Sequence, residues 1–490
     1  MSPDVSRYVP RVLKGVALVL LLLLGRKAFV EIDLHNYDSL AYHLPFAARF
    51  WDIVPPEKFL FLDWIESMYQ GFPLLGEILQ GLLWVFFGRI QAANFVALCA
   101  LVLYCGFVQV FLRIPWYLMF LALLAVPLVQ IHATGSLVDL PTNLATAVVL
   151  LFVYRAYAGG GVPSRVDIAV FGLAAAVSAN MKFLHLALVS VALLAMLGRL
   201  AYWYRVAERP ARRAIVHRAL LLTMTMPLIF ATTIKNTVHH GNPLFPLKVS
   251  AFGVTLPHTM APRTLSPDYL RTTPRAIRWG LSILEVRAFD ARRPYLWTGE
   301  QGYLPAGAPG DRMGGFFFLY VSLNLVLLGL LVARLRSREA RMGGVFFALL
   351  SIVTSVHVQS HELRYYMYWM ITLITLNLYF LVRAQDGRAF PVTPQQFGVV
   401  CCLVLAGVIW LTRGAYVRPL TQPVAVGYMG AIEPAIRAAI EKSPTICVAG
   451  RTNLFFLYTD TFHAPLRYSV KAARFESQCG SRVVVPALGG

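Results

Sequence analysis

The chain alternates between long apolar runs and short polar connections that are rich in arginine. A helix needs about 17 to 25 mainly apolar residues to cross a bilayer. Roughly eleven runs approach this length, so the pattern predicts an all-α, polytopic membrane protein with about eleven transmembrane helices. The expected spans are 12–30, 90–112, 115–132, 138–156, 167–181, 183–200, 219–236, 315–333, 343–359, 365–382 and 397–412.

The arginines predict which connections share a side of the membrane. With a cytoplasmic N-terminus, every second connection carries arginines, as the positive-inside rule requires. The long segments 31–89 and 237–313 then lie outside; the second is basic, but loops longer than about 60 residues are largely exempt from the rule. Within the first, the apolar stretch 72–88 contains Glu77 and Gln80. We expect an interfacial or re-entrant helix there, because a span would invert every later connection.

The first expected span, 12–30, has a short apolar core with basic residues on both sides. This pattern resembles a signal peptide, but no small-x-small cleavage site follows it. We therefore expect it to remain as a membrane anchor.

The polar and apolar residues after Thr412 are mixed, unlike those of the preceding membrane module, 1–412. This change predicts a small α/β domain over 413–490, which the topology places outside the membrane, in the periplasm of a bacterium. An oxidising compartment permits a disulfide between Cys447 and Cys479, although the sequence leaves this pairing open. The expected elements of the domain are a helix at 427–442 and strands at 445–449 and 482–485.

The composition supports the membrane class and gives no support to nucleic acid as a partner. Hydrophobic residues make up 58% of the chain and charged residues 14%, with a mean hydropathy of +0.62. Soluble domains have about 25% charged residues. The net charge of +20 comes from arginines spread between apolar runs, not from one basic stripe, so we expect membrane lipids to be their neighbours.

The predicted topology gathers unusual polar residues on the outer side, where they would line one cavity. Eight of the 24 acidic residues fall within 31–89. Ionisable groups at membrane depth are costly and usually pair or serve a site. The four most prominent are Asp38 in YDSLAYHLP, Asp139 in ATGSLVDLP, Lys182 in SANMKFLH and Arg364 in SHELRYYMYW.

These motifs resemble those of the type-C (GT-C) glycosyltransferases over about 1–412. This superfamily of integral membrane enzymes includes protein O-mannosyltransferases and lipid A aminoarabinose transferases, which use polyprenyl-phosphate-linked sugars. Asp38 matches the acidic motif of the family's first outer loop, and Asp139 matches an aspartate at the next outer turn. The blocks GNPLFP, GDRMGGFFF and LRYYMYW also resemble bacterial members.

Two departures leave the subfamily open. Family members often have Asp-Glu in the first loop, whereas Ser39 follows Asp38 here. Many also have a Lys-Pro-Pro stretch before the second span, where this chain has Gly71-Phe72-Pro73.

The resemblance implies an inverting transfer of a sugar from a polyprenyl-phosphate donor to a lipid, glycan or protein acceptor. The reaction would take place on the periplasmic side of a bacterial inner membrane. Asp38 would take the proton of the acceptor hydroxyl, a role that typically contributes roughly 10²–10⁴-fold. Lys182 and Arg364 would hold the leaving phosphate. The other expected substrate-binding residues are Tyr42, His43, Asp139 and His361.

Each of these residues also has a structural alternative. Asp38 and Asp139 are placed to cap helices, while Lys182 and Arg364 can extend to the interface, or Arg364 can pair with Glu362.

A divalent metal stays undecided, because relatives differ in their use of one. His357 and His361 are four residues apart, which places them on one face of a helix, a spacing that can bind zinc. They lack the His-Glu-x-x-His order of zinc proteases.

Two other functions fit the pattern as well. A secondary transporter or flippase of lipid-linked sugars would also have many spans and a polar cavity. An O-antigen or exopolysaccharide polymerase would use similar lipid-linked substrates.

Overall fold

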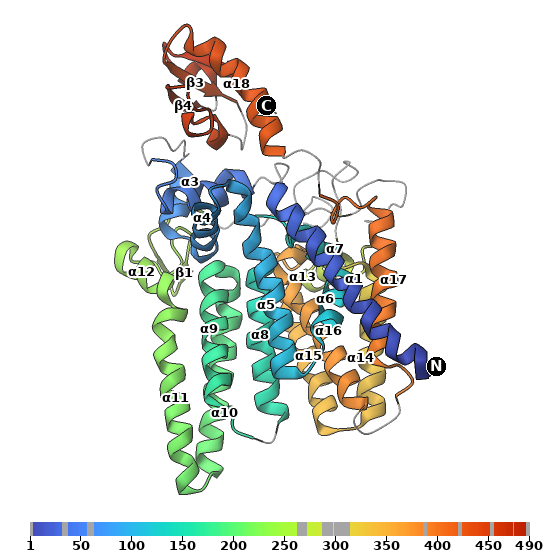
Figure 1. The fold of residues 1–490 in the computed structure, drawn as a ribbon. Helices are drawn as coiled ribbons and strands as arrows, with labels where there is room; N and C mark the ends of the chain where they lie inside the picture. Colours follow the sequence, from blue (N-terminus) through green and yellow to red (C-terminus); the bar gives the residue numbers. More distant parts are fainter. Residues whose placement is uncertain are drawn as a thin grey trace.

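The chain folds into a bundle of long helices, a layer of short helices above it and a small α/β unit at the top (Figure 1). The computed structural model describes residues 3–31, 38–55, 63–159, 161–261, 272–286, 297, 314–385, 390–419, 424–450, 455–473 and 475–486. The helices of the first half are α1 (Pro3–Val30), α2 (Leu44–Phe50), α3 (Asp63–Gly71), α4 (Leu75–Phe87), α5 (Phe95–Leu112), α6 (Trp116–Leu124), α7 (Pro127–His132), α8 (Asp139–Ala158), α9 (Arg165–Met181), α10 (Leu186–Val206), α11 (Arg209–Ile229) and α12 (Ala231–His240). Those of the second half are α13 (Arg275–Ile283), α14 (Phe318–Leu335), α15 (Arg338–Val356), α16 (Met367–Gln385), α17 (Pro394–Leu411) and α18 (Val424–Ile440).

The structure does not confirm the predicted count of about eleven spans. Among the described residues, eight helices are long and apolar enough to cross a membrane, or up to ten if each of two bent helix pairs is one span. The expected span 115–132 is divided into α6 and α7 because Pro127, at the start of α7, cannot continue the helix before it. The expected span 167–181 corresponds to α9, which has only 17 residues.

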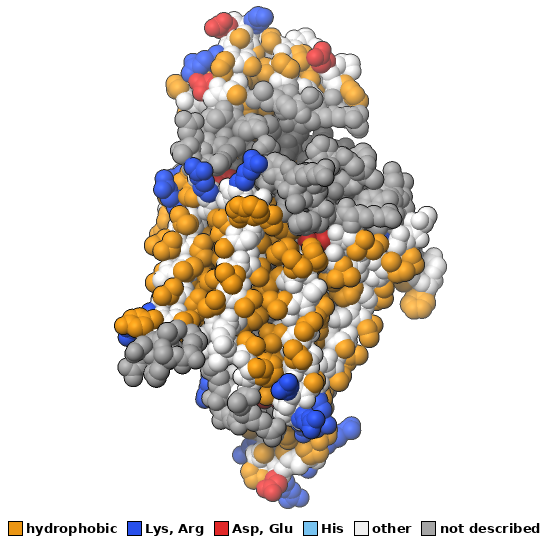
Figure 2. Space-filling view, turned by 90° about the vertical axis from the view of Figure 1, so that its right-hand side faces the viewer, with side chains coloured by type: hydrophobic (Ala, Val, Ile, Leu, Met, Phe, Trp, Pro, Cys, Tyr) orange, Lys and Arg blue, Asp and Glu red, His pale blue; other side chains and the backbone are white. Residues whose placement is uncertain are grey.

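One of the two bent pairs belongs to the layer of short helices above the bundle (Figure 1). Helices α3 and α4 meet at 92°, in the region where the sequence predicts an interfacial or re-entrant helix. Helices α11 and α12 meet at 49°. Figure 2 shows hydrophobic side chains over the middle of one face of the bundle, with Lys and Arg side chains above and below them. This banding is the arrangement expected of a multi-pass membrane protein.

Helices α8 and α16 form the centre of the bundle. Buried residues make up 83% of the most apolar window of α8 and 89% of that of α16, against 22% for α1. The central helices carry small and polar residues that bond across helices: Tyr104 of α5 and Thr375 of α16 lie 2.7 Å apart, hydroxyl to hydroxyl. Contacts of this kind hold membrane helices together where the hydrophobic effect cannot.

The GDRMGGFFF block ends at the start of α14, and its glycines permit a close approach there. The Glu285 carboxylate accepts hydrogen bonds from the amides of Gly315 and Phe317, at 2.9 and 3.2 Å. Gly314 and Gly315 have φ of 105° and 112°, and a Cβ on either would collide with Glu285 or with Leu128. Burial raises the pKa of Glu285, and the amide donors oppose this rise. Gly315 and Phe317 therefore anchor the N-terminal end of α14 to Glu285, whereas residues 310–313 of the block lie outside the described residues.

The segment that contains GNPLFP packs onto the first outer segment. The buried Asn236 side chain of α12 donates to the carbonyls of Gly71 and Phe245, at 2.7 and 3.0 Å. A Cβ on Gly71 would overlap the Phe245 carbonyl, so only glycine fits at this contact. Beyond it, β1 (Ser250–Ala251) and β2 (Val254–Thr255) form a short antiparallel hairpin.

The C-terminal unit combines α18 with a three-stranded parallel sheet in the order β4-β3-β5. The strand expected at 445–449 is present as β3, and Cys447 and Cys479 form a disulfide. The unit shares a hydrophobic cluster with the first outer segment, in which Leu40 and Leu44 pack with Leu457. The sheet strands are β3 (Thr445–Ala449), β4 (Ser469–Ala473) and β5 (Val483–Pro486).

Candidate active site

Four of the predicted site residues come together as two ion pairs at one end of the bundle, at the start of α8. Arg364 Nη1 lies 3.1 Å from Asp38 Oδ2. Lys182 Nζ donates to Asp139 Oδ1. The four residues belong to four separate segments: Asp38 begins a π-helical turn, Asp139 begins α8, Lys182 follows α9, and Arg364 lies in the 3-10 turn before α16. Asp139 and Arg364 are buried, and Asp38 and Lys182 are only partly exposed, so the charges act where solvent screens them weakly.

Tyr365 connects the two pairs. Its ring centroid is 4.0 Å from Lys182 Nζ and 4.7 Å from Arg364 Cζ, so both cations lie against one aromatic ring. Its hydroxyl also accepts a hydrogen bond from Arg364 Nη2 at 2.8 Å. Tyr365 was missed from the sequence, where its only signal is that it follows Arg364 directly.

Asn143 holds the two halves of the site together. Its buried side-chain amide donates to the carbonyls of Asp139 and Arg364, at 2.8 and 3.0 Å. Its oxygen accepts from the amide of Tyr368 at 2.8 Å. The sequence signal for this clamp is an asparagine inside an apolar span, four residues after Asp139.

The π-helical turn Ser39–His43 places Tyr42 near the ion pairs and the His43 ring 4.3 Å from that of Tyr42, centroid to centroid. The Leu44 amide bonds to the Ser39 carbonyl, five residues back, which widens the turn. His43, five positions after Asp38, therefore projects from nearly the same side of the turn as Asp38. In an α-helix it would project further from that side. Burial raises the pKa of Tyr42 well above its ordinary value, and Asp38 raises it further.

His43 is held by a buried carboxylate that sequence reasoning did not assign to the site. His43 Nδ1 lies 2.6 Å from Glu77 Oε1 of α4, and the two side chains are each about 95% buried. Glu77 Oε2 has no hydrogen-bond partner among the described residues. The sequence shows Glu77 only as a charge that interrupts an apolar stretch.

The alternative prediction, that Asp38 and Asp139 serve as N-caps of helices, does not fit the structure. Asp38 occupies the N-cap position of the π-helical turn but makes no side-chain capping bond. Helix α8 begins at Asp139 itself, with Val138 as its N-cap. The pairing of Arg364 with Glu362 is present beside the Asp38 pair, at 4.0 Å from Nε to Oε2.

The expectation that His357 and His361 share a helical face is wrong, because α15 ends at Val356 and both lie in the following turn. His357 Nδ1 lies 2.8 Å from the Tyr366 hydroxyl, and the His361 carbonyl accepts from Ser282 of α13 at 2.6 Å. Over the part of the chain that the structure describes, no group of three or more His, Cys, Asp or Glu side chains is placed to hold a metal ion.

Comparisons with known proteins place this architecture. No protein-family model and no curated protein sequence matches the chain. The crystal structure of ArnT from Cupriavidus metallidurans in the apo state matches 99% of this chain and 90% of its own, with a TM-score of 0.56 and 14% identity. The structure of the same protein bound to undecaprenyl phosphate matches 97% of this chain and 89% of its own, with a TM-score of 0.49 and 15% identity.

The match to apo ArnT extends over both the membrane helices and the C-terminal unit, since it covers nearly the whole of this chain. It confirms the fold that the motif resemblance implies. The chain therefore has the fold of ArnT.

Proposed function

We propose that the chain is an inverting glycosyltransferase that moves a sugar from a polyprenyl-phosphate donor to an acceptor on the periplasmic side of a bacterial inner membrane. The observation that carries the proposal is the meeting of Asp38, Asp139, Lys182 and Arg364 at one end of an ArnT-like fold. Residues 1–412 would form the catalytic membrane module, and residues 413–490 a periplasmic domain. The acceptor is a lipid, a glycan or a protein.

Lys182 and Arg364 are the proposed phosphate ligands. A lysine offers a compact charge and an arginine a planar fork, and both bind phosphate oxygens well. Each cation is held by an aspartate, so a donor phosphate would compete with Asp139 for Lys182 and with Asp38 for Arg364.

The proposed reaction is a single displacement at the anomeric carbon. The acceptor oxygen forms its bond to that carbon as the bond from carbon to the phosphate oxygen breaks, and polyprenyl phosphate leaves. The proton of the acceptor hydroxyl passes to the Asp38 carboxylate. Attack from the face opposite the phosphate inverts the anomeric configuration.

The pairing of Asp38 with Arg364 gives this reaction an order. Arg364 Nη1 occupies Asp38 Oδ2 at 3.1 Å, so this oxygen is engaged while the pair is intact. When the donor phosphate draws Arg364 toward itself, Asp38 Oδ2 is released to accept the proton of the acceptor hydroxyl. Donor binding would therefore precede activation of the acceptor.

The experiment that tests the function uses purified protein in lipid vesicles with a panel of polyprenyl-phosphate sugars and candidate acceptors. Mass spectrometry would detect a glycosylated acceptor together with free polyprenyl phosphate. Parallel reactions with EDTA would test dependence on a divalent metal.

The bent helix pairs α3–α4 and α11–α12 are a feature that transporters also have, which keeps a transporter or flippase as the second candidate. Donor that crosses the vesicle membrane unconsumed would support this candidate against the transferase. A product built only from donor sugars would instead indicate a polymerase.

Glu77→Gln is expected to lower the transfer rate about tenfold, because the amide is a weaker hydrogen-bond acceptor than the carboxylate and no longer fixes the orientation of the His43 imidazole. The donor KM should change little, since Glu77 is not a proposed phosphate ligand. Steady-state kinetics over a range of pH would measure both effects.

Glu66→Gln is the matched control for Glu77→Gln. Glu66 lies in the same outer layer, on α3, and forms a partly exposed ion pair with Arg49. Equal rate losses in the two variants would show that His43–Glu77 has no specific part in the reaction.

A further inference from the structure

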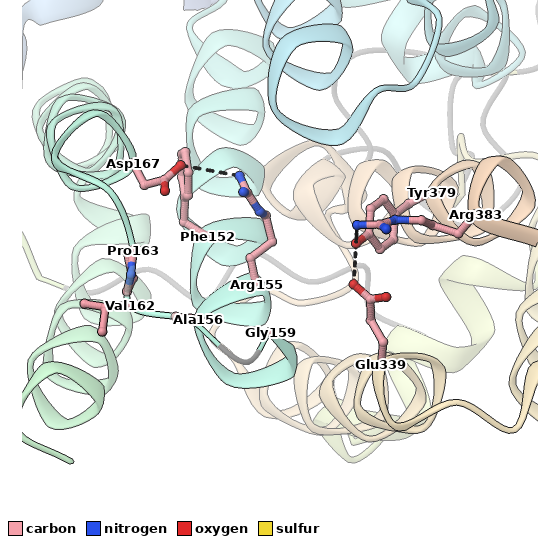
Figure 3. Close-up of a pocket in the computed structure, with 11 residues that line it drawn as sticks. Phe152, Arg155, Ala156, Gly159, Val162, Pro163, Asp167, Glu339, Tyr379 and Arg383 are labelled. Carbon is pink, nitrogen blue, oxygen red and sulfur yellow. Dashed lines mark hydrogen bonds and ion pairs between the residues drawn. The ribbon is translucent and has the colours of Figure 1, made fainter. Parts of the chain in front are cut away.

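A pocket of about 270 Å³ lies at the end of the bundle opposite the ion pairs (Figure 3). Its walls come from the last turns of α8 and α16 and the first turns of α9 and α15. Arg155 lines it and lies sixteen residues after Asp139 on α8, about 24 Å away at 1.5 Å per residue. The pocket is therefore separate from the candidate active site.

Two arginines and two carboxylates line this pocket. Arg155 Nη1 lies 3.5 Å from Asp167 Oδ1. Arg383 Nη2 donates to the Tyr379 hydroxyl at 3.3 Å, and that hydroxyl donates to Glu339. In Figure 3 the two arginines lie on different helices, with Asp167 on one side of the pocket and Glu339 on the other.

Both carboxylates are already used by helix N-termini. Asp167 accepts from the Ser164 amide at 2.8 Å, as part of the capping box of α9. Glu339 lies in the first turn of α15, where the helix dipole favours negative charge. Among the described residues, the buried Arg155 Nη1 has no hydrogen-bond partner. The unmet hydrogen-bonding capacity of the pocket is thus that of a cationic donor, which an anion would satisfy.

Three more arginines belong to the helices that form the pocket or bond to its wall. Arg199 Nε donates to the carbonyl of Ala156, a residue of the pocket wall, at 2.8 Å. Arg165 and Arg338 are the first residues of α9 and α15. Basic pockets between membrane helices on the cytoplasmic side are known to bind the head groups of anionic lipids.

We propose that this pocket binds a phosphate ester, with Arg155 and Arg383 as its ligands. The phosphate would accept a hydrogen bond from Arg155 Nη1, which pairs with Asp167 at 3.5 Å but makes no hydrogen bond among the described residues, and would share Arg383 with Tyr379. Two sources offer this chemistry, the head group of an anionic membrane lipid and a soluble phosphate. The proposal is independent of sugar transfer.

The test uses the full-length protein in neutral detergent and measures lipid retention by native mass spectrometry and the midpoint of thermal unfolding. The probes are phosphatidylglycerol, phosphatidylcholine and inorganic phosphate. Phosphatidylglycerol is expected to be retained and to raise the midpoint, and Arg155→Gln and Arg383→Gln are each expected to weaken retention about fivefold.

Arg213→Gln is the control, because Arg213 is exposed near the start of α11 and does not line the pocket. A rise in midpoint with inorganic phosphate alone, lost in Arg155→Gln, would support the pocket and identify a soluble ligand. The proposal is overturned if no probe binds, or if Arg213→Gln weakens binding as much as the two pocket variants.

Discussion

Asp38→Asn is expected to slow sugar transfer by about 10²–10⁴-fold, the contribution typical of a positioned general base. Asparagine keeps the size of the side chain but cannot accept the acceptor's proton. Donor binding should persist or tighten, because the donor phosphate no longer competes with the Asp38 carboxylate, which lies 3.1 Å from Arg364 in the wild type. Arg364 also stays in place, since Asn143 still donates a hydrogen bond to its carbonyl. Single-turnover rates and donor titrations would separate the two effects.

Asp52→Asn is the control for this variant. Asp52 lies in the same outer segment with a φ of 52°, a conformation that asparagine adopts readily. Full transfer by Asp38→Asn would remove Asp38 as the base. Loss of donor binding in that variant would instead show that Asp38 serves to hold Arg364 in place.

Lys182→Met is expected to destabilise the protein by about 3–5 kcal/mol, the range for leaving one member of a buried ion pair alone. Asp139 is only 1% exposed, and its Oδ2 already has no hydrogen-bond partner among the described residues. The double variant Lys182→Met with Asp139→Asn should recover most of this loss, because no buried charge is left uncompensated. The double variant should not recover transfer, since the phosphate still lacks Lys182. Unfolding in detergent and transfer assays on Lys182→Met, Asp139→Asn and the double variant would complete the double-mutant cycle.

Arg437→Gln provides the comparison for an exposed pair. Arg437 and Glu433 are four residues apart on the surface of α18, and such pairs contribute below about 1 kcal/mol. A Lys182→Met protein as stable as the wild type would show that Arg364 alone compensates Asp139. Transfer by the double variant would contradict the assignment of Lys182 to the phosphate.

The sequence predicted most membrane helices because lipid imposes a length and an apolar composition on each one. The sequence overcounted the spans where an apolar run of suitable length does not form one straight helix of that length. Pro127 divides one apolar run into α6 and α7, and α9 reaches only 17 residues. Hydropathy averages over a window and does not register a break at one residue.

The four charged residues that the structure brings together were singled out from the sequence, but the residues that support them were not. Asp38, Asp139, Lys182 and Arg364 were identifiable because charged residues are conspicuous near apolar spans. Asn143 and Tyr365 were not, because an amide or a phenol in a membrane helix is common and only its partners reveal its use. Glu77 was visible as an oddity in α4, but its pairing with His43 depends on how α4 packs against the π-helical turn.

The cluster that joins Leu40 and Leu44 to Leu457 also bears on how the chain matures. The ribosome makes residues near 40 early and residues near 457 more than four hundred positions later. Part of the apolar surface around Leu40 and Leu44 therefore stays uncovered until the C-terminal segment has been made and folded. The surroundings of the proposed base Asp38 are thus completed only by the last part of the chain to be synthesised.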